Sequence, residues 1–131
     1  MSFLAKLEID GEEMNVLEFQ CTLAQDTDKS GKPSSDPVGG KLRLVIESTK
    51  SVMLFDWMIS TSQTKNGVLT FFRRDAISKM RELQFKDGYC IRYDELFISY
   101  NDMPMRTEIL ISSKEITMNG SVFSRNWPLK F

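Results

Sequence analysis

Apolar and polar residues alternate with a period of two along most of the chain. The alternation is clearest over residues 3–9, 17–23, 41–47 and 83–93. Because successive side chains of a strand point to opposite faces of a sheet, this spacing predicts strands that each bury one face. Residues 68–72 are nearly all apolar, which predicts a strand covered on both faces.

Three dipeptides of the kind found in hairpin turns interrupt these patterns: Asp10-Gly11, Asp87-Gly88 and Asn119-Gly120. Each predicts a tight reversal of the chain. The alternation also slips by one residue within 89–100 and again within 109–118. A slip of this kind predicts a β-bulge, and bulges bend strands around the corner of a barrel or a sandwich.

Residues 52–59 depart from the period of two. They place Leu54, Trp57 and Met58 at i, i+3 and i+4, which predicts a short helix that packs through these three side chains. Thr49 or Ser51 can cap the start of this helix. Because the helix is apolar nearly all round, we expect the sheet to cover one side and a second copy of the chain to cover the other.

The segment 26–37 contains no aliphatic or aromatic residue. It predicts a twelve-residue loop inside a protein whose other turns are short. Loops of this length in compact domains tend to be either functional or disordered, and the residues alone leave both possibilities open.

The composition is that of an ordinary globular domain, with 131 residues, 41% hydrophobic and 27% charged. This length predicts a single domain, 1–131, with a sizeable core. The longest apolar run, 52–55, is far shorter than the roughly 20 residues that cross a bilayer, so we expect no membrane insertion. The first residues lack the pattern of a secretory signal peptide, so we expect a protein made in the cytoplasm that leaves the cell, if at all, without one.

The residue types that catalysis needs are scarce. The chain has no histidine, and Cys21 and Cys90 are too far apart in sequence for a zinc cluster. Asp26 and Asp28 form a carboxylate pair, but no apolar pocket or cation in the sequence separates their pKa values. We therefore expect no catalytic residue, no metal and no cofactor. A formal net charge of −1 gives no reason to expect nucleic acid as a partner.

The charges are unevenly distributed along the chain. Residues 1–28 carry one basic and seven acidic side chains, a net −6, whereas residues 73–92 carry six basic and three acidic ones, a net +3. Patches of opposite sign suit a head-to-tail contact between copies. The same distribution also fits solvated strand faces, and both interpretations stay open.

Several short motifs occur in order along the whole chain. They are Gln25-Asp26-Thr27-Asp28, Gly31-Lys32-Pro33-Ser34-Ser35, Gly39-Gly40, Glu47-Ser48-Thr49, Trp57-Met58 at the end of the predicted helix, Arg74-Asp75, Lys79-Met80 with Glu82-Leu83, and the closing Trp127-Pro128. In their joint order and spacing they resemble the tube proteins of type VI secretion systems, the family called Hcp or TssD, and most of all its Bacteroidetes branch.

This resemblance implies a mainly β fold of two antiparallel sheets curled into a barrel-like sandwich, with one short α-helix on its flank. It also implies a structural protein, not an enzyme, whose homohexameric rings stack into a tube. A contractile sheath drives such a tube into a neighbouring cell, a spike protein tips it, and effectors travel in its lumen. The protein is then cytoplasmic before firing and is secreted without a signal peptide.

In this family the long loop reaches toward an adjoining subunit, and the resemblance gives that role to thirteen residues here. They are Gln25, Asp26, Thr27, Asp28, Lys29, Ser30, Gly31, Lys32, Pro33, Ser34, Ser35, Asp36 and Pro37. Two alternatives remain beside the secretion tube. One is a phage-like tail-tube protein, and the other is a small β-barrel that binds an apolar ligand in its interior.

Overall fold

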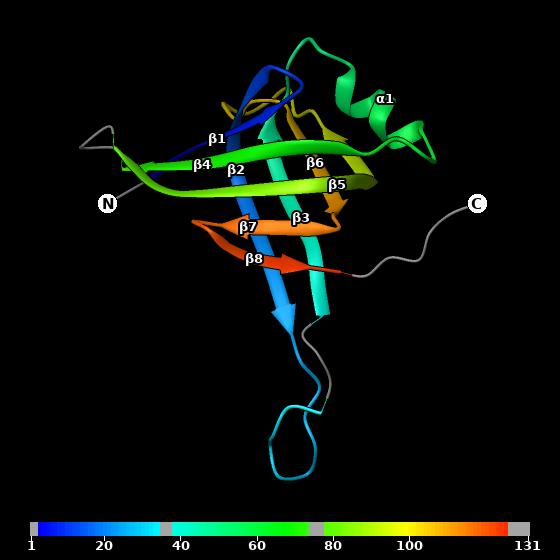
Figure 1. Ribbon diagram of the computed structural model, residues 1–131. Coiled ribbons are helices and arrows are strands. Elements are labelled where there is room, and N and C mark those ends of the chain that lie inside the picture. The colour runs from blue at the N-terminus through cyan, green and yellow to red at the C-terminus, as the bar shows by residue number, and fades with distance from the viewer. Residues whose placement is uncertain (1–2, 35–37, 74–77, 126–131) are drawn as a thin grey trace.

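The computed structural model describes residues 3–34, 38–73 and 78–125 (Figure 1). Within them the chain forms eight strands and one helix. The elements are β1 (Phe3–Ile9), β2 (Glu12–Ala24), β3 (Val38–Glu47), α1 (Met53–Ile59), β4 (Lys65–Arg73), β5 (Lys79–Leu96), β6 (Arg106–Ser112), β7 (Glu115–Met118) and β8 (Ser121–Ser124). The mainly β class with one short helix is confirmed.

The strands form one antiparallel sheet, in the order β4-β1-β2-β3-β6-β5-β7-β8. An additional pairing of β4 with β5 closes six of the strands into a ring, and the β7–β8 hairpin extends from β5. The expectation of two sheets is therefore wrong. Its physical reason lies in β5, which pairs with β4 over residues 79–88 and with β6 over residues 89–96. A strand that changes partner in this way joins the two walls into one closed sheet.

Two of the three predicted hairpin turns are confirmed. Asp10 and Gly11 join β1 to β2, and Asn119 and Gly120 join β7 to β8, all four with positive φ angles. The prediction of a hairpin turn at Asp87-Gly88 is wrong, because the strand β5 continues through these two residues. Asp87 has a φ of 54°, so the dipeptide bends the strand without reversing it.

The irregularities in the alternation have mixed causes. A bulge lies at Ile91 in β5, within the segment where one was expected, so Cys90 points into the core while Ile91 is exposed. Within 109–118 the prediction of a bulge is wrong, since β6 and β7 are separate strands.

An unpredicted bulge at Leu17 turns that side chain outward, against the expected buried face of β2. The strand β4 is also less covered than expected, because its outward-facing side chains are only half-buried.

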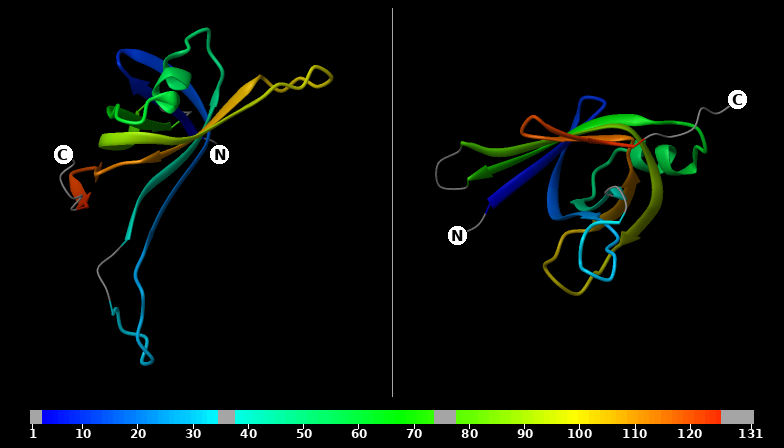
Figure 2. Two further views of the ribbon diagram at one scale, coloured as in Figure 1. Left: turned by 90° about the vertical axis from the view of Figure 1, so that its right-hand side faces the viewer. Right: turned by 60° about the horizontal axis from the view of Figure 1, so that its bottom comes forward.

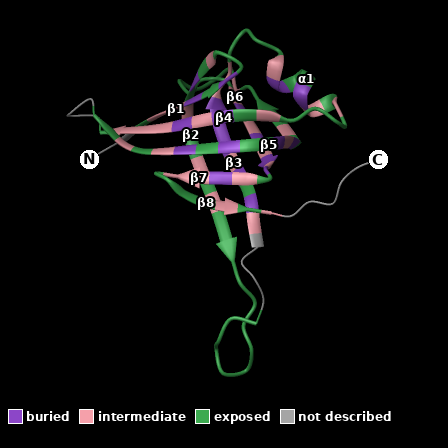
Figure 3. Cartoon of the chain, in the orientation of Figure 1, coloured by how far each residue is buried: buried purple, intermediate pink, exposed green. Residues whose placement is uncertain are grey.

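Buried apolar side chains of the described strands form a hydrophobic cluster together with Leu54 and Trp57 of α1, and Figure 3 marks the buried positions along the chain. It includes Leu42, Leu44 and Ile46 of β3, as the alternation predicts. A contact with Ser113 holds the beginning of β3 in place. The carbonyl of Gly40, whose φ is +88°, accepts hydrogen bonds from the backbone N–H and the hydroxyl of buried Ser113, at 2.8 and 3.2 Å.

The helix α1 is attached to the ring mainly through Trp57, which is fully buried. Its indole Nε1 donates to the carbonyl oxygens of Gln63 and Gly88, at 3.2 Å each. Its ring stacks on Phe85, with centroids 6.4 Å apart and planes at 6°. Leu54 is buried beside it and Met58 is half-buried, while Ser51 accepts the backbone N–H of Met53 at the start of the helix, at 3.1 Å.

Replacing Trp57 tests this attachment. We expect Trp57→Ala to lower the free energy of unfolding by about 3–5 kcal/mol, because it leaves a cavity and two unpaired carbonyls. The variant Trp57→Phe keeps an aromatic ring beside Phe85 and loses the N–H and part of the indole ring, so a smaller loss of about 1–3 kcal/mol is expected. Urea denaturation followed by circular dichroism measures both. A loss below about 1 kcal/mol for Trp57→Ala would contradict the role given to this residue.

Candidate functional site

The described residues offer little for covalent or metal chemistry. No group of three or more Cys, Asp or Glu side chains among them is placed to hold a metal ion. Both cysteines are free thiols. Burial raises the pKa of Cys90 to about 11 and also raises the pKa of Cys21. Because the thiolate is the nucleophilic form, the raised pKa lowers the reactivity of both thiols at neutral pH.

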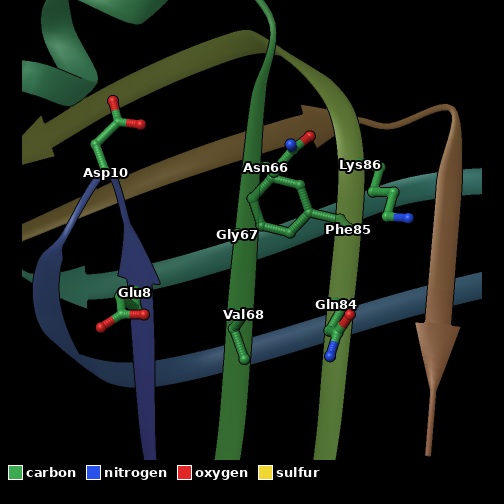
Figure 4. Close-up of a pocket in the computed structure, with 8 residues that line it drawn as sticks. All are labelled: Glu8, Asp10, Asn66, Gly67, Val68, Gln84, Phe85 and Lys86. Atoms are coloured by element: carbon green, nitrogen blue, oxygen red, sulfur yellow. The ribbon is translucent and has the colours of Figure 1, made fainter. Parts of the chain in front are cut away.

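The hollows that the described residues line are small. One of about 180 Å³ lies at the end of β1, between Asp10, Asn66 and Phe85 (Figure 4). Two others, of about 190 and 90 Å³, lie near Glu108 and Met103. Ligand pockets in proteins usually hold about 300–1,000 Å³. With Leu44, Phe85 and Ile109 filling the interior of the ring, the geometry gives no support to a barrel that binds an apolar ligand.

The long loop is the most prominent feature of the exterior. It continues the direction of β2 and β3 and projects well beyond the sheet (Figures 1 and 2). The described part is exposed throughout, whereas Ser35, Asp36 and Pro37 lie outside the described residues. Thr27 and Pro33 form an isolated antiparallel bridge, and the N–H of Ser34 donates to the carbonyl of Asp26 at 2.7 Å. The described part is therefore a folded turn.

Asp28 organises the tip of this loop. Its Oδ1 accepts hydrogen bonds from the hydroxyl of Ser30 at 2.7 Å, from the N–H of Ser30 at 2.8 Å and from the N–H of Lys32 at 3.1 Å. The hydroxyl of Ser30, followed by the two backbone N–H groups, lowers the pKa of the Asp28 carboxyl. The ionised carboxylate thus holds the turn in shape and leaves the side chains of Lys29 and Lys32 exposed.

Much of the charge on the outer face of the ring is paired within the chain. Arg43 pairs with Glu108 and, at 3.2 Å, with Glu18, which lies 3.8 Å from Arg106. These pairs join β2, β3 and β6 across their outer face. The hydrogen bonds to Glu108 and Glu18 raise the pKa of Arg43. At the acidic end of the chain, Asp10 pairs with Lys65 and Glu13 with Lys6.

Exposed large apolar side chains gather in two places, and others are exposed singly on the strands, namely Leu4, Leu17, Leu23, Ile91 and Val122. The first is the segment between β5 and β6, together with the last residue of β5. The exposed side chains there are Leu96, Phe97, Tyr100, Met103 and Met105. The second is the outer side of α1, with Val52, Phe55 and Ile59. Contiguous exposed apolar patches are typical of surfaces that another molecule covers.

The alternation within 89–100 places Leu96, Ile98 and Tyr100 in a strand, which is confirmed for Leu96 and wrong for Ile98 and Tyr100, because β5 ends at Leu96. The signal for an exposed loop was present in Asn101-Asp102 and Pro104, which favour turns between the apolar residues. The residues predicted as site residues lie in two separate places, and only those of the long loop are exposed, because Leu54 and Trp57 of α1 are buried. The long loop lies at one end of the body and α1 lies near the other (Figure 1). No helix of the described segments is long and apolar enough to cross a membrane.

Comparison with known proteins gives a consistent result. The family model described as hemolysin coregulated protein Hcp (TssD) matches residues 1–128. The structure of Hcp1 from Flavobacterium johnsoniae is similar with a TM-score of 0.88 and 35% identity, over 93% of this chain and 99% of that one. This organism belongs to the Bacteroidetes, as the motifs suggest.

More distant structures share the fold. Hcp1 from Salmonella typhimurium is 15% identical with a TM-score of 0.74, over 95% of this chain and 93% of that one. A secreted protein Hcp3 from Pseudomonas aeruginosa is 10% identical with a TM-score of 0.64, over 98% and 100%. No curated protein matches this chain.

Replacing Asp28 tests the origin of the loop's shape. In Asp28→Ala we expect the amides of Ser30 and Lys32 to exchange faster with solvent, because their acceptor is gone. The unfolding free energy of the barrel should change by less than about 0.5 kcal/mol, since the loop is exposed. Asp28→Asn keeps an acceptor oxygen and is the matched control. Unchanged exchange in Asp28→Ala would contradict the assignment.

Acidification tests the same contact. The pKa of Asp28 is lower in the folded loop than its ordinary value of 3.8, so the contact is fully formed above 3.8 and is lost as the pH falls through the lowered pKa. The amide shift of Ser30, followed by NMR, should therefore titrate with a midpoint below 3.8. A midpoint at or above that value would contradict the assignment.

Proposed function

Because the chain belongs to the Hcp (TssD) family of type VI secretion tube proteins, we propose that it assembles into homohexameric rings that stack into the secretion tube. The family consists of structural tube proteins and not of enzymes. We further propose that residues 1–131 act as a single tube-protein domain. The family match favours this tube over a phage-like tail tube.

The observation that carries the proposal is the folded loop at one end of a closed barrel. The hydrogen bonds described above for residues 26–34 join loop residues to one another. A polar projection that is organised by its own side chains can enter an adjoining subunit without prior ordering, which reduces the entropic cost of contact. We therefore assign the contact with a neighbouring copy to residues 25–37.

The strand β2 gives the assembly a direction. Its 13 residues begin at the Asp10-Gly11 turn and end where the long loop starts. At about 3.3 Å per residue this strand spans roughly 40 Å. Two different surfaces at the ends of one strand suit a heterologous contact between stacked copies, which continues along an axis without closing.

The partners follow from the family. We propose that a contractile sheath surrounds the tube, that a spike protein tips it and that effectors occupy its lumen. The protein is then cytoplasmic before firing and secreted afterwards. The proposal includes no nucleic acid, metal or cofactor.

Removal of the loop tests the proposal. We expect replacement of residues 26–37 by a short Gly-Ser linker to leave the barrel folded and to weaken assembly, because a contact surface is lost. Light scattering coupled to size exclusion, over a range of concentrations, measures the mass. The full chain should approach six times its 15.1 kDa.

Circular dichroism and urea denaturation of the shortened chain are the controls for folding. Assembly of the shortened chain equal to that of the full chain would show that the loop is not an assembly element. A full chain that stays monomeric at every concentration would contradict the ring.

A further inference from the structure

We infer that the apolar hairpin tip between β5 and β6 packs on the outer face of α1 in the next copy around the ring. The hairpin tip is defined as residues 96–105. The outer face of α1 is defined as Val52, Phe55 and Ile59. This inference rests on the proposed ring and names the two surfaces that close it.

The hairpin tip is an apolar projection with a defined conformation. Tyr100 is 88% exposed and Phe97 is 68% exposed. The N–H of Met103 donates to the Oδ1 of Asn101 at 3.0 Å, and Arg106 Nη2 lies 3.6 Å from the sulfur of Met103. These contacts hold the tip in a defined turn while its aromatic side chains face solvent. Aromatic side chains are enriched among the residues that dominate protein interfaces.

The outer face of α1 is the complementary surface. Val52, Phe55 and Ile59 recur at intervals of three and four residues, so they lie on one side of the helix, away from buried Leu54 and Trp57. The ring of Phe55 is held edge-on against Tyr93 of the same chain, with centroids 5.7 Å apart and planes at 86°. The helix therefore offers a fixed apolar surface that its own sheet leaves uncovered.

The two surfaces are placed as a ring requires. In the left view of Figure 2, the hairpin tip (yellow) projects from one side of the body and α1 (green) lies over the other side at about the same height, and in the right view the two lie at different parts of the circumference. The long loop lies at the other end of the molecule. A rotation about an axis parallel to the loop brings the hairpin tip of one copy to α1 of the next, and repetition of one such heterologous contact closes a ring. The loop stays free for the neighbouring ring.

The exposed area fits an interface core. Phe55 is 49% exposed. Together with Phe97 and Tyr100 it leaves on the order of 300–500 Å² of aromatic surface uncovered, taking 150–250 Å² as the area that one such residue can bury. A standard interface buries about 1,600 Å² over both partners, and these side chains are divided between the two sides, so they supply roughly a fifth to a third of one contact.

One pair of charges beside the two surfaces is complementary, and one exposed acid, Asp56, also lies on α1. Asp102 in the hairpin tip and Lys50 just before α1 are both exposed. Neither forms an ion pair within the described part of the chain. Charges of opposite sign at the rim of an apolar contact favour the orientation that brings them together.

Cysteine cross-linking in the full chain tests the contact. Phe55→Cys and Tyr100→Cys, purified separately and mixed under mild oxidation, should give a covalent dimer on a non-reducing gel. Each variant alone should give at most the background that the native Cys21 and Cys90 produce. The matched control pairs Phe55→Cys with Val122→Cys, which is similarly exposed on β8 but lies outside the proposed contact.

Side-chain removal provides the second readout. We expect Tyr100→Ser to raise the concentration needed for the six-chain mass by about tenfold or more, as loss of an aromatic anchor does at other interfaces. Ser99→Ala, in the same hairpin tip, removes no apolar side chain and should assemble like the parent chain. Circular dichroism of both variants confirms that the barrel is folded.

The outcomes separate this inference from the proposed function. Six-chain masses that persist in Tyr100→Ser, without a cross-link between positions 55 and 100, would overturn the inference while the ring stands. The hairpin tip would then face another occupant, such as the sheath. A parent chain that is monomeric throughout would overturn both.

Discussion

The hydrogen bond from the indole of Trp57 to the carbonyl of Gly88 marks the point on which the whole architecture depends. At Asp87-Gly88 the strand β5 bends and changes partner from β4 to β6, and this change closes the sheet into a ring. Glycine is required there, because a Cβ on Gly88 would lie 2.9 Å from the side chain of Ile111. Trp57 covers the bend, stacks on Phe85 and so couples the helix to the closure of the barrel.

Closure has a consequence for function. A small ring of strands fills its own interior with side chains, and here the cluster around Leu44, Phe85 and Ile109 does so. Little room remains for a ligand, and the thiols that the core holds are protonated. The surfaces proposed for assembly lie on the outside of the ring. The strand ends carry the long loop and the hairpin tip, and the flank carries α1.

The sequence predicted the parts of the fold that depend on local pattern. Alternation located β1 and β3, and positive-φ dipeptides located two turns, because both signals act between near neighbours. The pattern misinterpreted Asp87-Gly88 as a hairpin turn. A bend within a strand and a reversal of the chain use the same backbone conformation at such a dipeptide, and they differ only in which strands pair on either side of it. It also missed the outward position of Leu17, because a bulge is set by pairing with β3 and not by the residue itself. At the candidate site the polar loop was visible in the composition. The apolar hairpin tip was hidden, because its residues resemble a buried strand.

The two exterior surfaces differ in their physical character, and this difference suits a two-step assembly. The hairpin tip and α1 are apolar, so contact between them is driven by burial of surface and depends little on salt. The long loop is polar and charged, so its contacts are screened by ions and are worth less per residue. Rings held by apolar contacts can therefore persist while the stacking between them is made and broken. A tube built in this way can lengthen by adding whole rings and can separate into rings after delivery without unfolding its subunits.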